Sequence, residues 1–147
     1  MDANVTGAEM TAVQVDYLLL ADAAQVQNGK LYLLGGGWDR LQFQEYPQSL
    51  QIAVILGVMV PWSETNRRHT FRLVGRTADA DQELFKAEGE FEVGRPPGTP
   101  QAMPQIFQVA LQIPLNVPRP GSYEVVGDID DGKATKRRPF FAVSVTG

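Results

Sequence analysis

Short runs in which apolar and polar residues alternate dominate this sequence. Residues 69–77 and 84–93 show the alternation most cleanly. Successive side chains of a β-strand point to opposite faces, so a period of two gives a strand one face for a core and one for solvent. No stretch carries the pattern of an amphipathic helix. The alternation therefore predicts a nearly all-β protein, with fewer than about a tenth of its residues in helices.

Turn residues separate about eight such runs. The pair Asn28-Gly29 favours the two positive φ angles of a type I′ turn, and it predicts a hairpin between residues 13–21 and 31–34. Residues 50–60 are apolar on both faces, so this strand is expected in the middle of a sheet. Short strands at regular spacing predict an antiparallel two-sheet β-sandwich, immunoglobulin-like or C2-like.

The chain is expected to form one sandwich domain over residues 13–147, preceded by a flexible arm over residues 1–12. The first twelve residues show no sustained pattern, and untethered termini are commonly mobile. A chain of 147 residues that is 44% hydrophobic can enclose a single core. The alternation places the following side chains in that core: Phe71, Phe91, Leu111, Tyr123 and Val143.

The charge and cysteine content narrow the classes of partner and chemistry. Thirteen Lys and Arg against seventeen Asp and Glu give a net charge of −4. Nucleic acids and anionic membranes attract clustered positive charge, so neither is an expected partner. Without cysteine there is no disulfide and no thiolate nucleophile. The N-terminus has no basic region followed by a long apolar run, so a cytoplasmic protein is expected.

Four sequence blocks resemble a family of small bacterial β-sandwich proteins with no assigned function: LLLADAAQVQNGKLYLLGGGWDRLQF, VPWSETNRRH, GEFEVGRPPG and PRPGSYEV. The resemblance extends from about residue 15 to residue 145. It implies the same all-β fold. It implies no activity and no catalytic residue.

Three glycines, residues 35–37, follow the second predicted strand. A phosphate loop needs Gly-Lys-Ser/Thr at the start of a helix, which is not found here, so a bulge or a bend between sheets is the better interpretation. Trp38, Asp39 and Arg40 follow this bend and are candidate contacts for a ligand or partner. The alternative is a tryptophan packed over the end of the sandwich beside an exposed Asp39 and Arg40.

His69 is the single histidine, so a catalytic triad or a zinc site would have to use it. Asp39, Glu64 and His69 are the candidate acid and base groups of a carboxylate/His-dependent enzyme. Because His69 opens a strand and has no spaced partner motif, a surface or hydrogen-bonding histidine is favoured. We assign no catalytic residue, no metal ligand and no cofactor from the sequence.

The direction of the strands predicts which loops lie together. If the strands from residue 50 onward reverse direction in turn, residues 61–68, 94–104 and 130–132 share one end, and residues 78–83 and 116–121 share the other. The first end gathers charges of both signs and an aromatic ring: Trp62, Glu64, Arg67, Arg68, Arg95, Asp130 and Asp131, next to His69. We expect a ligand or partner to contact this end, at Trp62 and Arg67 above all.

These observations favour a non-enzymatic binding or protein-interaction module, in which loops on a rigid sandwich contact a protein partner. Two alternatives stay open. One is the carboxylate/His-dependent enzyme. The other is a structural subunit of a larger assembly, in which exposed edge strands join copies of the chain into a homo-oligomer.

Overall fold

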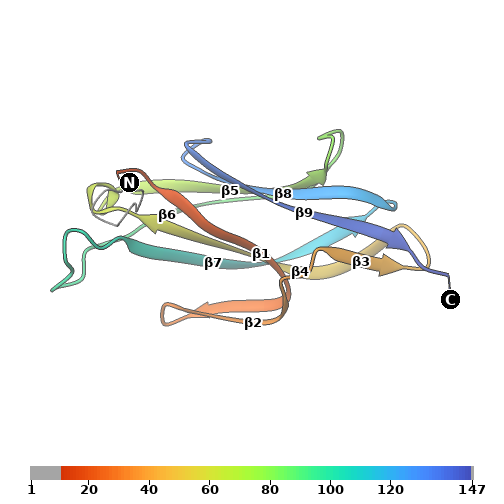
Figure 1. The fold of residues 1–147 in the computed structure, drawn as a ribbon, viewed down its shortest axis with the longest axis horizontal. Helices are drawn as coiled ribbons and strands as arrows, with labels where there is room; N and C mark the ends of the chain where they lie inside the picture. Colours follow the sequence, from red (N-terminus) through yellow and green to blue (C-terminus); the bar gives the residue numbers. More distant parts are fainter. Residues whose placement is uncertain (1–10, 147) are drawn as a thin grey trace, which may run out of the picture.

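The computed structural model describes residues 11–146, which form nine β-strands and no α-helix (Figure 1). The predicted arm lies outside the described residues except for Thr11 and Ala12. The one helical element described is a short 3₁₀ turn at Trp62–Glu64. The strands are β1 (Gln14–Gln27), β2 (Lys30–Gly36), β3 (Arg40–Phe43), β4 (Gln48–Val60), β5 (Arg68–Thr77), β6 (Glu83–Glu92), β7 (Gln105–Val117), β8 (Gly121–Ile129) and β9 (Ala134–Ser144).

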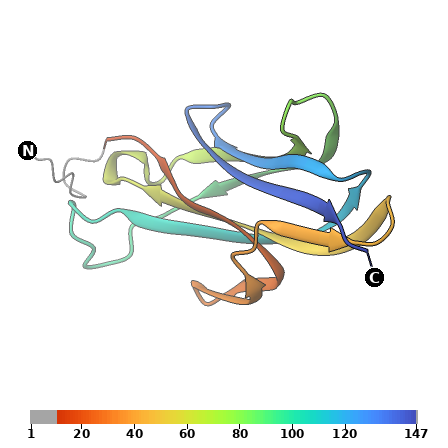
Figure 2. The ribbon, with the colours of Figure 1, turned by 45° about the vertical axis from the view of Figure 1, so that its right-hand side comes forward.

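The strands build two sheets that face each other, so the predicted all-β, two-sheet sandwich is confirmed (Figure 2). One sheet has four strands in the order β2-β1-β4-β7, and the other has five in the order β3-β9-β8-β5-β6. β4 lies between β1 and β7, as its two apolar faces predict. The finer assignment to an immunoglobulin-like or C2-like sandwich stays a prediction.

The hydrophobic core fills the space between the sheets. Of the five predicted core residues, Phe71, Phe91 and Tyr123 are buried, whereas Leu111 and Val143 are only partly buried. Both sheets contribute further buried side chains to this core: Leu18, Leu20, Ile52, Val54, Leu56, Val58, Leu73, Leu115, Val125, Ile129 and Phe140.

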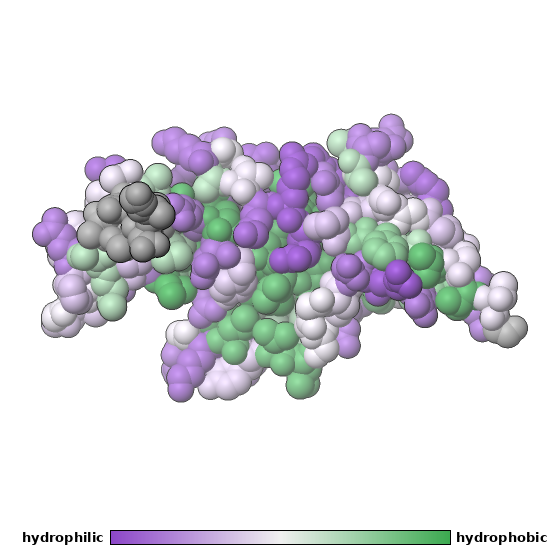
Figure 3. Space-filling model, viewed as in Figure 1, coloured by the Kyte–Doolittle hydropathy of each residue, from purple (hydrophilic) through white to green (hydrophobic). Residues whose placement is uncertain are grey.

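The predicted first hairpin is confirmed, and its first strand is longer than expected. Asn28 and Gly29 have φ angles of 53° and 74°, as a type I′ turn requires. Up to Ala21, β1 pairs with β4, and beyond it β1 pairs with β2. The hairpin covers a second, smaller cluster on the outer face of the four-stranded sheet, which includes Ala53 and Ile55. Figure 3 shows a green, hydrophobic area in the lower part of the molecule, where this hairpin lies.

The glycine segment carries the chain from the four-stranded sheet to the five-stranded one. Gly35 and Gly37 have φ angles of 61° and 84°, which confirms the predicted bend, because residues with a Cβ rarely adopt these values. The chain then forms β3, which pairs in parallel with the end of β9. This pair departs from the expected antiparallel arrangement. It was not predicted, because β3 has only four residues and depends on a partner about a hundred residues further along the chain.

The inward face of β9 is opposite to the one that the sequence suggested. Phe140 and Ala142 are buried in the core, whereas Phe141 and Val143 lie on the other face and are partly exposed. Four consecutive residues here are apolar, so either face of the strand could point into the core. Alternation therefore does not predict which face is buried. The choice is made by pairing, which places Phe140 opposite Tyr123, and the two rings stack with centroids 5.3 Å apart.

The two adjacent phenylalanines of β9 provide a test of this assignment. Phe140→Ala should lower the free energy of unfolding by roughly 3–5 kcal/mol, because it opens a cavity between Tyr123 and Trp38. Phe141→Ala should lower it by no more than about 1 kcal/mol, because that ring lies on the outer face beneath the Arg40 guanidinium. Urea denaturation measures both values, and an equal or reversed order would contradict the assignment.

Candidate functional site

Three loops meet at one end of the sandwich, as the strand directions predict. We call this the His69 end; it comprises residues 61–69, 94–104 and 130–132. The Asn66 amide donates to the Val93 carbonyl (2.7 Å), and the Asp130 amide donates to the Thr70 carbonyl (2.9 Å). At the other end of the sandwich, an Arg119 guanidinium nitrogen donates to Gln82 Oε1 (3.2 Å), which joins residues 78–83 and 116–121.

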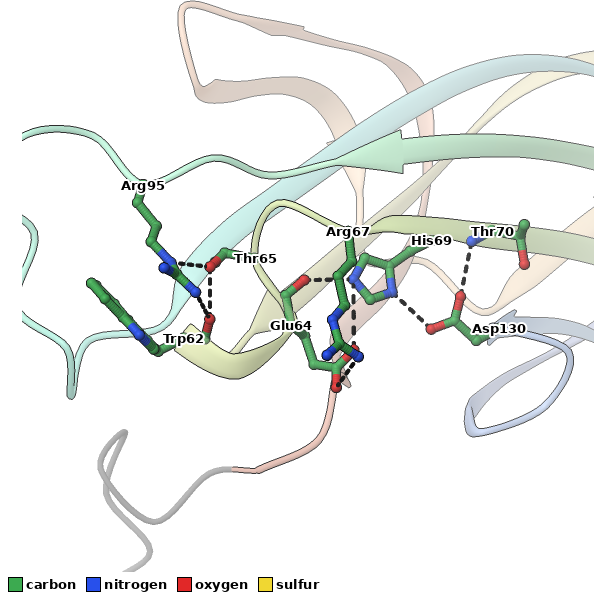
Figure 4. Close-up of polar contacts among 8 residues, drawn as sticks. All are labelled: Trp62, Glu64, Thr65, Arg67, His69, Thr70, Arg95 and Asp130. Atoms are coloured by element: carbon green, nitrogen blue, oxygen red, sulfur yellow. Dashed lines mark hydrogen bonds and ion pairs between the residues drawn. The ribbon is translucent and has the colours of Figure 1, made fainter.

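His69 is the centre of this end, and it is buried (Figure 4). Its side chain is 2% exposed and hydrogen bonded, so of the two favoured alternatives, a surface or a hydrogen-bonding histidine, the structure shows the second. Nδ1 lies 2.8 Å from Asp130 Oδ2, and Nε2 lies 2.8 Å from the backbone carbonyl oxygen of Glu64. One face of the ring stacks on Phe91. The histidine therefore joins β5 to the turn after β8 and to the loop before β5.

Both ring nitrogens of His69 face acceptors, and this arrangement favours the imidazolium. Burial on its own would lower the pKa of His69. The Glu64 carbonyl and the Asp130 carboxylate outweigh burial and hold the pKa above its usual value. Burial would likewise raise the pKa of Asp130, but the hydrogen bonds from His69 and from the Thr70 amide (3.0 Å) lower it. His69 and Asp130 thus form a hydrogen-bonded pair in which each residue favours the charged form of the other.

Arg95 fixes the loop that carries Trp62. Its guanidinium lies over the indole, with Cζ 4.1 Å from the ring centroid. Arg95 Nε donates to Thr65 Oγ1 (2.5 Å), and a terminal nitrogen donates to the Trp62 carbonyl (3.0 Å). Thr65 is itself buried and donates from Oγ1 to the same carbonyl. These contacts hold Trp62 in one place on the loop (Figure 4).

The remaining candidates at this end point into solvent. The side chains of Arg67 and Arg68 are 66% and 72% exposed, and within residues 11–146 each forms a long ion pair, 3.8 Å to Glu64 and 3.8 Å to Glu90. Exposed pairs of this kind contribute about 0–1 kcal/mol. Two arginines therefore project from a loop whose backbone is held by His69 and Arg95.

The other three candidates, Trp38, Asp39 and Arg40, lie at the far end of β9. The Asp39 carbonyl accepts the Phe141 amide, and seven residues of strand separate Phe141 from Ala134 beside the His69 end, or about 23 Å. Trp38 packs edge-on against Phe140, and Asp39 and Arg40 are exposed. The structure therefore confirms the packing interpretation of Trp38 and separates these three residues from the others.

This geometry has two consequences for chemistry. Asp39 is too far from Glu64 and His69 to act with them, and both nitrogens of His69 are already bound within the protein. Among residues 11–146, no group of three or more His, Asp or Glu side chains is placed to hold a metal ion. The same part of the chain has no helix long and apolar enough to cross a membrane.

Two features of the His69 end were not found from the sequence. Asp130 was grouped with this end only by strand direction, and its contact with His69 depends on the register in which Phe71 lies opposite Ile129. Thr65 was not identified at all. A threonine between charged loop residues carries no pattern, and its role depends on where Arg95 arrives from a separate loop.

A family model matches residues 16–142 of this chain. The chain belongs to DUF6941, a family of unknown function. No curated protein matches it. Among solved structures, it is similar to the C-terminal domain of Wzt, with 11% sequence identity and a TM-score of 0.45, over 92% of this chain and 74% of that one. The family match agrees with the resemblance found in the sequence and assigns no activity.

Proposed function

We propose that this member of DUF6941 is a non-enzymatic binding module that contacts a protein partner through the His69 end. The observation that carries the proposal is the use of the single histidine. His69 is buried, and both of its nitrogens hold loops in place, so the one imidazole of the chain supports structure. The same contacts hold the chain around Trp62, Arg67 and Arg68 in place before a partner binds.

A fixed loop surface favours binding because the loops are ordered before the partner arrives. Ordering a loop on binding reduces affinity, and a loop already held by hydrogen bonds avoids much of that cost. Here Arg95 holds Trp62 through two contacts, one with its ring and one with its carbonyl, and His69 holds the loop through the Glu64 carbonyl. Tryptophan and arginine are also the side chains that most often dominate binding energy at protein interfaces. Cytoplasmic location is part of this proposal and is supported by the cysteine-free sequence.

The proposal is tested by capture of partners from the native host with matched surface variants. Arg67→Glu with Arg68→Glu reverses two exposed charges at the His69 end, and Arg119→Glu reverses an exposed charge at the opposite end. A partner retained by the wild type and by Arg119→Glu should be lost from the double variant by about tenfold or more. All three proteins should have the same melting temperature, because none of these side chains is buried.

Hydrogen exchange on the captured complex locates the contact. Residues 61–68 should be protected, and residues 78–83 and 116–121 should exchange as in the free protein. A partner that is retained equally by all variants, or that protects only residues 78–83 and 116–121, would contradict the proposal.

A further inference from the structure

The imidazole of His69 lies between two acceptors that belong to different parts of the chain (Figure 4). Nδ1 faces the Asp130 carboxylate in the turn after β8, and Nε2 faces the Glu64 backbone carbonyl in the loop before β5, each at 2.8 Å. An imidazolium can donate to both acceptors, because both of its nitrogens carry a proton. A neutral imidazole carries one proton, so it can donate to Asp130 or to Glu64 but not to both. Loss of the second proton therefore breaks one of the two connections.

The two acceptors differ in strength, and this difference decides which hydrogen bond survives. A carboxylate is a stronger acceptor than a backbone carbonyl, so the neutral ring should keep its proton on Nδ1 and donate to Asp130. Nε2 then presents a lone pair to the Glu64 carbonyl, and such a contact leaves both acceptors without a donor. Asp130 is also held without the histidine: Oδ1 accepts the Thr70 amide (3.0 Å), and the Asp130 amide donates to the Thr70 carbonyl (2.9 Å). The connection to Glu64 is therefore the one that breaks.

The charged groups around the ring favour the same order. The Glu64 carboxylate lies 4.0 Å from Nε2 and supports the charged ring, and it also lies 3.8 Å from the exposed Arg67. Lys133, in the turn after β8, stabilises the charged form of Asp130. β6 contributes the apolar ring of Phe91. Once the imidazole is neutral, the Glu64 carboxylate loses its attraction to Nε2, whereas Asp130 keeps the positive charge of Lys133 nearby.

A small cavity lies beside the two residues that flank the ring. It has a volume of about 100 Å³ and is lined by Glu64, Asp130 and Lys133 together with residues 11–13 and 134. A polar cavity of this size has room for water. Water at this place can exchange protons with the groups around the buried imidazole and can solvate the loop when the Glu64 carbonyl leaves the ring.

We infer that His69 is a pH-dependent switch: the imidazolium joins residues 62–65 to β5, and the neutral imidazole releases them while the turn of residues 130–132 stays in place. The released part is the 3₁₀ turn Trp62–Glu64 with Thr65. The chain beyond it stays fixed, because the Asn66 amide donates to the Val93 carbonyl (2.7 Å). The switch thereby regulates the order of the surface around Trp62, and its effect on a partner rests on the proposed function. The release itself is a property of the free chain.

Nuclear magnetic resonance of the free, full chain tests the switch, because the single histidine gives imidazole signals that need no assignment. As pH rises, the wild-type ring should lose the proton on Nε2 and keep the one on Nδ1. The Glu64 and Thr65 amides donate within the turn, and their protection from hydrogen exchange, corrected for the intrinsic effect of pH, should fall with the same midpoint. We expect a fall of roughly tenfold or more, as for the loss of a hydrogen bond to a charged group. The Asn66 and Asp130 amides should keep their protection.

Two variants separate the switch from general effects of pH. His69→Gln has no titrating group at this place, so the protection of the Glu64 and Thr65 amides should not change over the same range. Asp130→Asn removes the carboxylate that favours the imidazolium, so titration of the ring and loss of protection should move to lower pH together.

Three results would overturn the inference: protection that stays constant while the ring titrates, a neutral ring with its proton on Nε2, or a ring that stays charged up to about pH 10, where tyrosine and lysine titrate. No partner takes part in these measurements. Failure here and failure of the proposed function are therefore distinguishable.

Discussion

Phe91→Ala should lower the free energy of unfolding by roughly 3–5 kcal/mol. The ring is buried between the two sheets and connects them: it stacks on Phe107 of β7 with centroids 4.1 Å apart and on His69 of β5 with centroids 5.3 Å apart. Its removal leaves a cavity where the edges of the two sheets meet. It also removes the ring on which the His69 imidazole stacks. No neighbouring side chain can fill that space without leaving its own contacts.

Urea denaturation of the wild type, Phe91→Ala and Glu92→Ala measures this effect. Glu92 follows Phe91 in β6, is exposed and points to the other face, so its change should alter the free energy by less than about 0.5 kcal/mol. Phe91→Leu should fall between the two, because it restores part of the lost volume. A Phe91→Ala protein as stable as Glu92→Ala would show that the ring does not fill the gap between the sheets.

Local features of the sequence predict much of this fold. The alternation in β5 and β6 identifies their inward faces because polar residues occupy the other face, and the buried Phe71 and Phe91 confirm it. Asn28-Gly29 and the glycines of residues 35–37 predict a turn and a bend, because few other residues adopt positive φ angles. Strand direction then predicts which loops share an end.

Features that depend on long-range pairing could not be predicted in the same way. The face of β9 is chosen by its register with β8, because Phe140 and Phe141 are equally apolar. β3 forms only because β9 lies beside it. The contact between His69 and Asp130 joins residues 61 apart, and it depends on the register between β5 and β8. The sequence therefore predicts the end of the sandwich at which the candidate residues lie, while the hydrogen bonds among them follow from pairing that no local pattern records.

His69 should make the stability of this protein fall as pH rises above the unfolded pKa of histidine, about 6.5. Its folded pKa is held above the unfolded value of about 6.5, so its contribution is fully present below that pH and is lost as pH rises through the folded pKa. Asp130 has the opposite sign: its folded pKa is below the usual 3.8, so its contribution is present above that pH and is lost as pH falls. His69 and Asp130 therefore both stabilise the folded protein fully between about pH 4 and 6.5.

Replacement of the histidine should remove the alkaline decline. At pH 5.5, His69→Gln should be less stable than the wild type by roughly 2–3 kcal/mol, because hydrogen bonds to a charged imidazolium are lost in a buried place. At a pH above the folded pKa of His69 the difference should be clearly smaller, since the wild-type imidazole is then neutral in the folded protein as well. His69 is the only histidine, so the α-amino group is the one other group whose usual pKa lies in this range.

Melting temperatures from pH 5 to 9 test the assignment with two further variants. Asp130→Asn keeps most of the shape of the turn but removes the carboxylate that supports the imidazolium, so its profile should flatten like that of His69→Gln. Glu64→Gln leaves the Glu64 backbone carbonyl in place on Nε2 and changes only a carboxylate 4.0 Å away, so its profile should stay close to that of the wild type. Parallel profiles for the wild type and His69→Gln across this range would mean that His69 binds its proton equally well in the folded and unfolded chain. The hydrogen-bonded pair would then not be the device that holds the loops of the His69 end together.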